Sequence, residues 1–326
     1  MSLARPAASS QVIEPQIPSK ASEQTRRTGI SYAIAAYLIW GLFPLYWKQL
    51  EGIPALQLIG HRIVWSFALL ANVVALTGQP RQLLRALDAR AIRIYIAAAV
   101  LISINWFAYV WAVTNGMIVE ASLGYYINPL FSVLLGLIFF REHLRRRQWI
   151  PIGLATAGVL YLTATLGSFP WLAILLALTF GLYGAVKKAA PLGALFGLTT
   201  ETGLLFVPAL AYLVFCDTHG TGAFLHASLA QDILMAGAGI VTAVPLLLFA
   251  GAAMRVPLNT IGILQYMTPT AQFLLGVLLY REPFPISRFI GFGIVWLALV
   301  LFWLEGEYER RSRRSQLASL SAHSES

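Results

Sequence analysis

The fold is decided by the segment at residues 120–142, which reads EASLGYYINPLFSVLLGLIFFRE. It is one long apolar run that carries Asn128-Pro129 inside it and ends at Arg141-Glu142. A bilayer core about 30 Å thick needs about 20 mostly apolar residues in helical form. The segment therefore predicts a helix that crosses a membrane, with its charged side chains at the two ends.

The composition of the whole chain agrees with this interpretation. Hydrophobic residues make up 58% of the 326 residues, charged residues only 11%, and the mean hydropathy is +0.71. Water-soluble domains carry about 25% charged residues, so this chain has too little charge to cover a soluble globule. The net charge of +9 comes from short basic clusters between apolar runs, without the interleaved aromatics of a nucleic-acid site.

The chain has one cysteine, Cys216, which excludes an intrachain disulfide and a cysteine metal cage. We expect no cofactor and no metal. The partners that we expect are a small-molecule substrate and the lipid bilayer, and no nucleic acid.

Ten segments have the length and apolarity of membrane helices, so we predict an all-α integral membrane protein with ten transmembrane helices. The segments are 30–48, 57–77, 91–112, 120–140, 149–166, 170–187, 198–215, 232–253, 260–280 and 287–304. The polar tails at 1–28 and 305–326 are expected to be disordered and cytoplasmic.

The basic residues predict the orientation. With the N-terminus in the cytoplasm, 19 of the 23 Lys and Arg residues fall in segments that face the cytoplasm. Only Lys48, Arg281 and Arg288 fall outside, and Arg62 lies within a helix. Since cytoplasmic loops carry the excess of Lys and Arg, both termini are predicted to be cytoplasmic.

The opening segment has a counterpart 140 residues later. Tyr126 to Pro129 aligns with Tyr266 to Pro269, and Arg141-Glu142 aligns with Arg281-Glu282. The same register pairs Gly136 with Gly276 and Gly153 with Gly293. The alternative is a generic similarity of apolar helices.

We interpret the repeat as two five-helix halves, 29–166 and 167–304. Because five is an odd number, the second half begins on the opposite side of the membrane and is inverted. Inverted repeats around a midplane site are a recurring architecture of secondary transporters, in which the two halves provide alternating access.

Polar residues inside membrane helices are costly, so they usually face the bundle interior or a water-filled cavity. The predicted substrate-binding residues are Lys48, His61, Arg62, Asn105, Trp106, Tyr109, Tyr126, Asn128, Gln265, Tyr266, Thr268 and Gln272. Three alternatives stay open for the cations: Arg62 pairs with Glu120 or Glu51, Lys48 reaches the headgroups, and His61 only packs. Gln265 and Gln272 have the alternative of hydrogen bonding between helices.

Pro129 and Pro269 lie inside predicted helices and are candidate gating residues, because a proline removes a backbone donor and kinks or breaks a helix. The alternative is a static kink. The chain has no membrane aspartate, and Glu120, Glu142 and Glu282 lie near helix ends. We therefore expect no buried carboxylate that relays protons.

Several stretches resemble the EamA family of the drug/metabolite transporter superfamily, and within it the RarD-type permeases, called chloramphenicol-sensitive proteins. The resembling stretches are 40–48 (WGLFPLYWK), 60–66 (GHRIVWS), 105–106 (NW), 119–130 (VEASLGYYINPL), 245–250 (PLLLFA) and 264–266 (LQY). Asn105 is followed by Trp106-Phe107-Ala108-Tyr109, where this family would have more aliphatic residues. The resemblance covers roughly residues 29–304 and implies a permease of the bacterial inner (plasma) membrane with ten helices in two inverted repeats.

We therefore predict a permease that moves a small polar or amphipathic metabolite, or a drug-like molecule, by alternating access. The alternative is a membrane sensor or adaptor that transports nothing. An enzyme is not expected, because the chain has no HExxH, no GxSxG, no metal-spaced His/Cys set and no paired membrane carboxylates.

Overall fold

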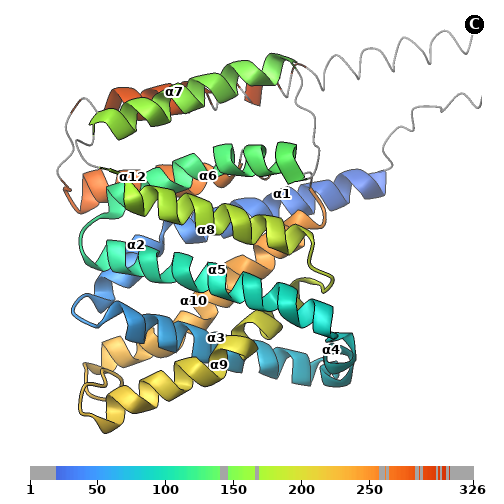
Figure 1. Ribbon diagram of the computed structural model, residues 1–326, viewed down its shortest axis with the longest axis vertical. Coiled ribbons are helices and arrows are strands. Elements are labelled where there is room, and N and C mark those ends of the chain that lie inside the picture. The colour runs from blue at the N-terminus through green and yellow to red at the C-terminus, as the bar shows by residue number, and fades with distance from the viewer. Residues whose placement is uncertain are drawn as a thin grey trace, which may run out of the picture.

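A computed structural model of the chain describes residues 20–139, 146–165, 169–256, 261, 264–282, 286, 289–298, 300–301, 303–305 and 308. Within these residues the regular structure is helical, and long helices lie side by side across Figure 1, from α7 at the top to α9 at the bottom. This confirms the predicted all-α class.

The described residues of the first half form nine helical elements. They are α1 (Lys20–Gly41), α2 (Phe43–Trp47), η1 (Lys48–Leu50), α3 (Ala55–Leu76), α4 (Pro80–Ala86), α5 (Ala89–Thr114), α6 (Ile118–Phe139), η2 (Arg146–Gln148) and α7 (Trp149–Thr165). Because α1 begins at Lys20, residues 20–28 are helical, and our expectation of a disordered tail is wrong for them. Arg27 donates to Glu23 at 3.0 Å, an i,i+4 pair that supports this extension of the apolar helix.

The second half continues with further helices. They are α8 (Trp171–Lys188), α9 (Ala194–Thr218), α10 (Leu229–Ala253), α12 (Met267–Leu274), the π-helix η3 (Leu275–Leu279) and an apolar helix over Phe289–Glu305.

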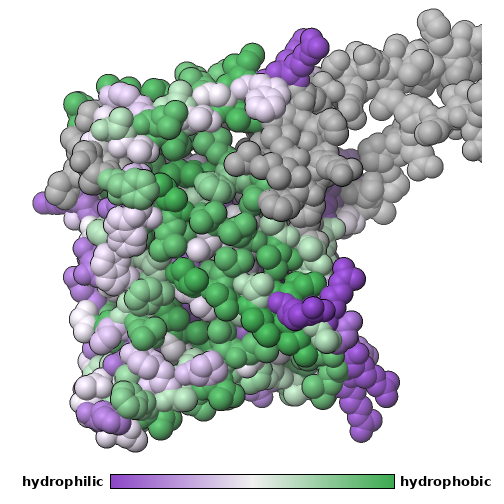
Figure 2. Space-filling model, viewed as in Figure 1, coloured by the Kyte–Doolittle hydropathy of each residue, from purple (hydrophilic) through white to green (hydrophobic). Residues whose placement is uncertain are grey.

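Five helices among the described residues are long and apolar enough to cross a membrane. They are Glu23–Leu50, Ala55–Leu76, Ala89–Thr114, Ala194–Thr218 and Leu229–Ala252. Figure 2 shows apolar side chains over the middle of one face, with hydrophilic side chains gathered at its left and right edges. Large apolar side chains such as Val207 are 70% exposed, as expected for a surface that faces lipid. The protein therefore has a multi-helix membrane fold.

Two of the predicted membrane helices are interrupted. The first breaks at Leu42, between α1 and α2, and the ninth turns at Tyr266 before α12 begins. Pro44 explains the first break, because it has no N–H to donate to the carbonyl of Trp40 four residues earlier. Broken membrane helices expose backbone groups, which must then find partners inside the protein.

The two halves of the chain interlock. The main helix contacts join α6 to α8, α3 to α9 and α10, α1 to α10 and α12, α5 to α8 and α9, and α6 to α12. The core therefore lies between helices from both halves, and it includes Trp47, Ile102, Leu176 and Ala243, each at most 1% exposed.

Candidate substrate site

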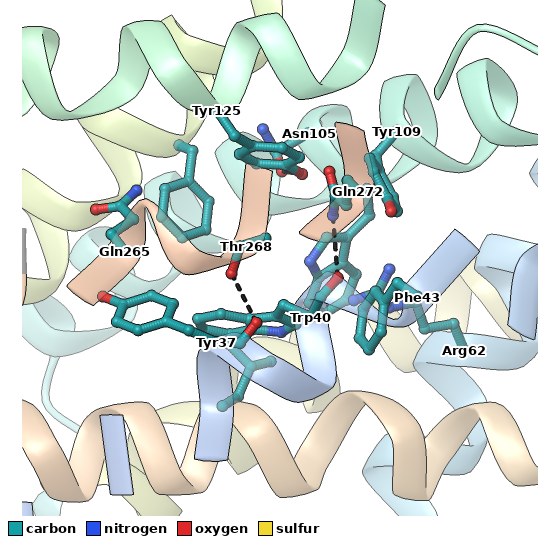
Figure 3. Close-up of a pocket in the computed structure, with 13 residues that line it drawn as sticks. Tyr37, Trp40, Phe43, Arg62, Asn105, Tyr109, Tyr125, Gln265, Thr268 and Gln272 are labelled. Atoms are coloured by element: carbon teal, nitrogen blue, oxygen red, sulfur yellow. Dashed lines mark hydrogen bonds between the residues drawn. The ribbon is translucent and has the colours of Figure 1, made fainter. Parts of the chain in front are cut away.

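A cavity lies between the two halves, enclosed by α1, α2, α3, α5, α6, α8, α10 and α12 (Figure 3). Its lining comprises Tyr37, Trp40, Phe43, Arg62, Asn105, Trp106, Tyr109, Tyr125, Phe180, Leu246, Gln265, Thr268 and Gln272. Its volume is about 40 Å³. One water molecule needs about 10 to 15 Å³, whereas small-molecule pockets measure about 300 to 1,000 Å³. The cavity therefore has room for water in this conformation, and it must widen to admit a metabolite.

Seven of the twelve predicted substrate residues line this cavity. They are Arg62, Asn105, Trp106, Tyr109, Gln265, Thr268 and Gln272. The first four come from α3 and α5 in the first half, and the others come from α12 and the turn before it in the second half.

Arg62 is the charged residue of the lining. It lies seven residues into α3, about 10 Å along the helix from Ala55, and it is only 2% exposed. Its guanidinium stacks at 4.0 Å from the ring centroid of Trp106 and lies 5.6 Å from that of Phe43 and 5.5 Å from that of Trp47. Cation–π attraction therefore holds the side chain in place.

Arg62 forms neither of the two ion pairs that we considered as alternatives, with Glu51 or with Glu120. Glu51 pairs instead with Lys48 at 3.3 Å, and Glu120 makes no ion pair with Arg62. The Nε and Nη1 atoms of Arg62 are buried and have no hydrogen-bond partner among the described residues.

The break in the first helix is joined to α12 by two hydrogen bonds, both drawn in Figure 3. Gln272 Nε2 donates to the carbonyl oxygen of Trp40 at 3.0 Å, which is the carbonyl that Pro44 leaves free. Thr268 Oγ1 donates to the carbonyl oxygen of Tyr37 at 2.9 Å. Gln272 Oε1 remains buried without a partner among the described residues, so one acceptor stays available at the cavity.

Asn105 has a fuller set of partners. Its Nδ2 donates to the carbonyl oxygen of Leu176 at 3.0 Å and to Thr179 Oγ1 at 2.9 Å, and its Oδ1 lies 3.5 Å from the Tyr125 hydroxyl. These bonds tie α5 to α8 and orient Tyr125 over the cavity. The arrangement makes Asn105 a residue that positions the wall.

Tyr126 and Tyr266 lie outside the cavity, in a neighbouring aromatic cluster. Their ring centroids are 6.1 Å apart, and Tyr126 also packs on Phe292 at 5.1 Å. The Tyr126 hydroxyl bonds with Thr270 at 2.9 Å and accepts from Trp296 Nε1 at 2.8 Å. The two tyrosines, one from each half of the chain, therefore pack against each other beside the cavity.

Three more predicted residues lie elsewhere. Asn128 is fully buried and faces Gly181 on α8, and neither of its amide atoms has a partner among the described residues. Lys48 follows α2 at the end of the first predicted helix, beside Glu51 and 5.8 Å from the ring centroid of Tyr280. His61 packs on Phe224 at 4.9 Å, on the side of α3 that faces the loop between α9 and α10.

The two prolines occupy different positions. Pro129 lies within α6, which runs unbroken from Ile118 to Phe139, and its side chain lies outside the described residues. Pro269 is the third residue of α12, where a missing N–H costs no helical hydrogen bond. It follows the turn at Tyr266 as Pro44 follows the break at Leu42, so the ninth predicted helix is interrupted just before this proline.

Most of the aromatic lining was not predicted from the sequence. Tyr37, Trp40, Phe43, Tyr125 and Phe180 line the cavity together with Leu246. The predicted site was chosen mainly by polar groups at membrane depth, which Phe43, Phe180 and Leu246 lack. Tyr37 and Tyr125 carry hydroxyl groups and met this criterion without being selected. The WGLFP stretch at 40–44 contained the missing signal, since a proline that breaks a membrane helix usually does so beside a cavity.

Glu201 is the second residue that the sequence analysis did not single out, although it is a buried carboxylate in a predicted membrane segment. It lies in α9 and is 1% exposed. Its Oε1 accepts from Lys187 Nζ at 2.6 Å, and its Oε2 accepts from the Tyr183 hydroxyl at 3.0 Å. Glu201 is the fourth residue of the predicted membrane segment 198–215, and this position could have identified it as a buried carboxylate.

Known proteins resemble this chain along most of its length. The model of the EamA-like transporter family matches residues 27–164. Protein RarD of Streptomyces exfoliatus is 44% identical over 90% of this chain and 93% of its own length. The uncharacterized transporter YojE of Bacillus subtilis is 45% identical over 89% of this chain and 98% of its own.

A solved crystal structure adds the fold. It covers 86% of this chain and 98% of its own, with a TM-score of 0.61 and 16% identity, and at that identity the likeness shows the fold alone. With relatives above 40% identity over nearly their full length, multi-pass helices that fit a bilayer, and an enclosed cavity between them, the chain belongs to the EamA-like transporter family.

Proposed function

We propose that this protein is a carrier that moves a small polar or amphipathic molecule across the bacterial inner membrane by alternating access. The observation that carries the proposal is the cavity that residues of both halves of the chain line together. A carrier needs a site that each half can expose in turn to one side of the membrane. The cavity fits this need, because residues from both halves of the chain line it.

The helix contacts support the two related halves. The 140-residue offset equates α1 with α8, α3 with α9, α5 with α10 and α6 with α12. If the two halves are related by this repeat, each helix contact should have an equivalent between the counterpart helices. The contacts α6–α8, α3–α10 and α1–α10 predict the equivalents α12–α1, α9–α5 and α8–α5, and all three are present. The α3–α9 and α6–α12 contacts map onto themselves. The family model's match to 27–164 nearly coincides with the proposed first half, 29–166.

The rival function is a membrane sensor or adaptor, which would keep the fold and bind a ligand without releasing it across the membrane. A carrier and a sensor differ in one measurable property, which is exchange of labelled for unlabelled substrate across a sealed bilayer.

The test starts with the metabolites whose intracellular or extracellular amounts differ between cells with and without this protein. Each is then loaded into proteoliposomes, and uptake of the labelled compound from outside is measured. A carrier gives saturable uptake that an excess of internal unlabelled compound accelerates. Uptake is expected to fall in Arg62→Ala and to persist in Arg85→Ala, a matched change at an exposed arginine on α4.

Tyr126→Ala tests whether transport depends on the cavity itself or also on the residues around it, since Tyr126 lies in the neighbouring aromatic cluster. We expect a smaller loss of uptake than for Arg62→Ala. If both variants transport normally, the proposed site is wrong, and if no compound moves at all, the sensor or adaptor becomes the better description.

A further inference from the structure

We infer that the cavity binds an organic monoanion, namely a carboxylate with an aromatic or aliphatic body, and that Arg62 holds the carboxylate. This inference rests on the proposed function, and it names the class of substrate. Its basis is a buried cation that lacks an anion in this conformation.

The charge balance of the cavity is the first argument. Among the thirteen described lining residues, Arg62 carries a full charge and none is Asp, Glu, Lys or His. A charge removed from water is unfavourable unless an opposite charge or a set of hydrogen bonds compensates it. The three aromatic rings around Arg62 attract the cation but accept none of its N–H bonds. The guanidinium is therefore held in position with its charge uncompensated.

The unused hydrogen-bonding groups are the second argument. Arg62 Nε and Nη1 are buried donors without a partner among the described residues. The Tyr109 hydroxyl, also in the lining, is buried and unpaired in the same part of the chain. A guanidinium presents its donors as a planar fork, which matches the two oxygens of a carboxylate.

The number of charges selects a monoanion. A phosphate monoester near its second ionisation carries between one and two negative charges, and sites for it usually gather several cations. Here one arginine faces neutral side chains. A single carboxylate brings the charge of the occupied cavity to zero.

The shape of the lining describes the rest of the molecule. Figure 3 shows Arg62, Phe43 and Tyr109 at one end of the cavity and Tyr37 and Gln265 at the other, with aromatic rings between the two ends. The Tyr109 and Tyr125 centroids are 5.6 Å apart, and those of Tyr125 and Phe180 are 6.2 Å apart. These faces suit a flat or apolar body, and the free Gln272 Oε1 can accept a hydrogen bond from it.

The test compares three phenylalanine derivatives that differ in charge, together with one phosphate monoester. N-acetylphenylalanine is an anion, N-acetylphenylalaninamide is neutral and phenylalaninamide is a cation; phenyl phosphate is the fourth probe. Binding to the full-length protein in detergent is followed by tryptophan fluorescence, since Trp40 and Trp106 line the cavity, and by the shift in thermal unfolding.

The wild-type protein is expected to bind the anion at least about tenfold more tightly than the neutral amide and the cation, because a hydrogen-bonded charge pair contributes that much. Arg62→Gln is expected to remove this preference, and Arg62→Lys to keep part of it, because lysine retains the charge without the fork. Arg85→Gln, the same change at the exposed arginine on α4, is expected to match the wild type.

Three results overturn the inference: equal or tighter binding of the amide or the cation, tighter binding of phenyl phosphate, and no binding of the anion. If Arg62→Gln fails to fold, the inference is tested by comparing the preference for the anion in the wild type with that in Arg62→Lys. Transport is scored separately in proteoliposomes. Saturable flux of a neutral or cationic compound would contradict the anionic substrate class and would still support a carrier. Binding of the anion without any flux would contradict the carrier function and would still support the anion-binding site.

Discussion

Glu282 shows how one side chain connects the two halves of the chain at one end of the helix bundle. It follows Arg281, whose backbone is left-handed with φ of 53°, and it lies beyond the membrane-spanning part of the ninth helix. Its Oε1 and Oε2 accept from the backbone N–H groups of Ile118 and Val119 at 3.0 and 2.8 Å. These N–H groups begin α6 and have no partner within that helix.

The titration of Glu282 predicts a pH dependence. Burial raises the pKa of Glu282 above its ordinary value of 4.5, although the two N–H groups and Lys48 partly oppose the shift. A raised pKa means that the folded state favours the proton. The contribution of this group to stability is therefore present below about pH 4.5 and is lost as the pH rises through the folded pKa.

We therefore expect the melting temperature of the wild type, relative to that of Glu282→Gln, to fall as the pH rises above about 4.5. Glu51→Gln, the same change at an exposed carboxylate that is paired with Lys48, serves as the matched control. A difference that rises with pH would mean that the ionised carboxylate is the stabilising form.

Glu201 gives a second prediction at this scale. Its carboxylate is buried, while the side chain of its partner Lys187 is 22% exposed. Removing one member of a buried pair usually costs about 3 to 5 kcal/mol, and the access of Lys187 to water favours the lower end. Glu201→Gln is expected to lower the free energy of unfolding by about 3 kcal/mol, measured by denaturant titration in detergent micelles.

The double variant Glu201→Gln with Lys187→Met is the control for this pair. Because neither charge remains buried without its partner, it is expected to be more stable than Glu201→Gln alone. Equal stability of the two variants would show that the ion pair contributes little.

At the scale of elements, the most extensive contact between the two halves is that of α6 with α8. Gly124 permits it, because a Cβ at this position would lie 2.9 Å from the carbonyl oxygen of Ala173 and 2.9 Å from the Cβ of Leu176. A backbone oxygen cannot move aside as a flexible side chain can. The contact distance between these helices therefore depends on one missing methyl group.

We predict that Gly124→Ala destabilises the protein by about 1 to 3 kcal/mol through overpacking. Gly184→Ala makes the same change on α8, where a Cβ would meet nothing within 4 Å, and is expected to be neutral or slightly stabilising because alanine favours helix. Thermal unfolding of both variants in one detergent makes the comparison. Equal effects would show that the α6–α8 spacing is not tight.

At the scale of the whole molecule, the prediction concerns orientation. Arg85 on α4 and Asn115 after α5 are both exposed, and they lie at opposite ends of α5. With Cys216→Ser as background, Asn115→Cys is expected to react with a membrane-impermeant maleimide from outside the cell. Arg85→Cys is expected to react only after permeabilisation, because its loop is rich in arginine. The reverse labelling would place both termini outside.

The sequence by itself determined that this chain forms membrane helices, where most of them lie and which family it resembles. Each segment's partition between lipid and water depends on its own residues, so apolar runs such as 57–77 could be recognised one at a time. The likeness of 120–142 to the segment 140 residues later was equally visible, because a repeat is a property of the sequence itself.

Only the tertiary structure decided which polar residues share a cavity. Tyr125 and Tyr126 are neighbours in sequence, but successive residues of a helix point about 100° apart, so one lines the cavity and the other packs with Phe292. The same holds for His61 and Arg62, of which one packs on Phe224 and the other enters the cavity. How each helix is turned about its axis depends on packing against helices far away in the chain, and no local pattern encodes it.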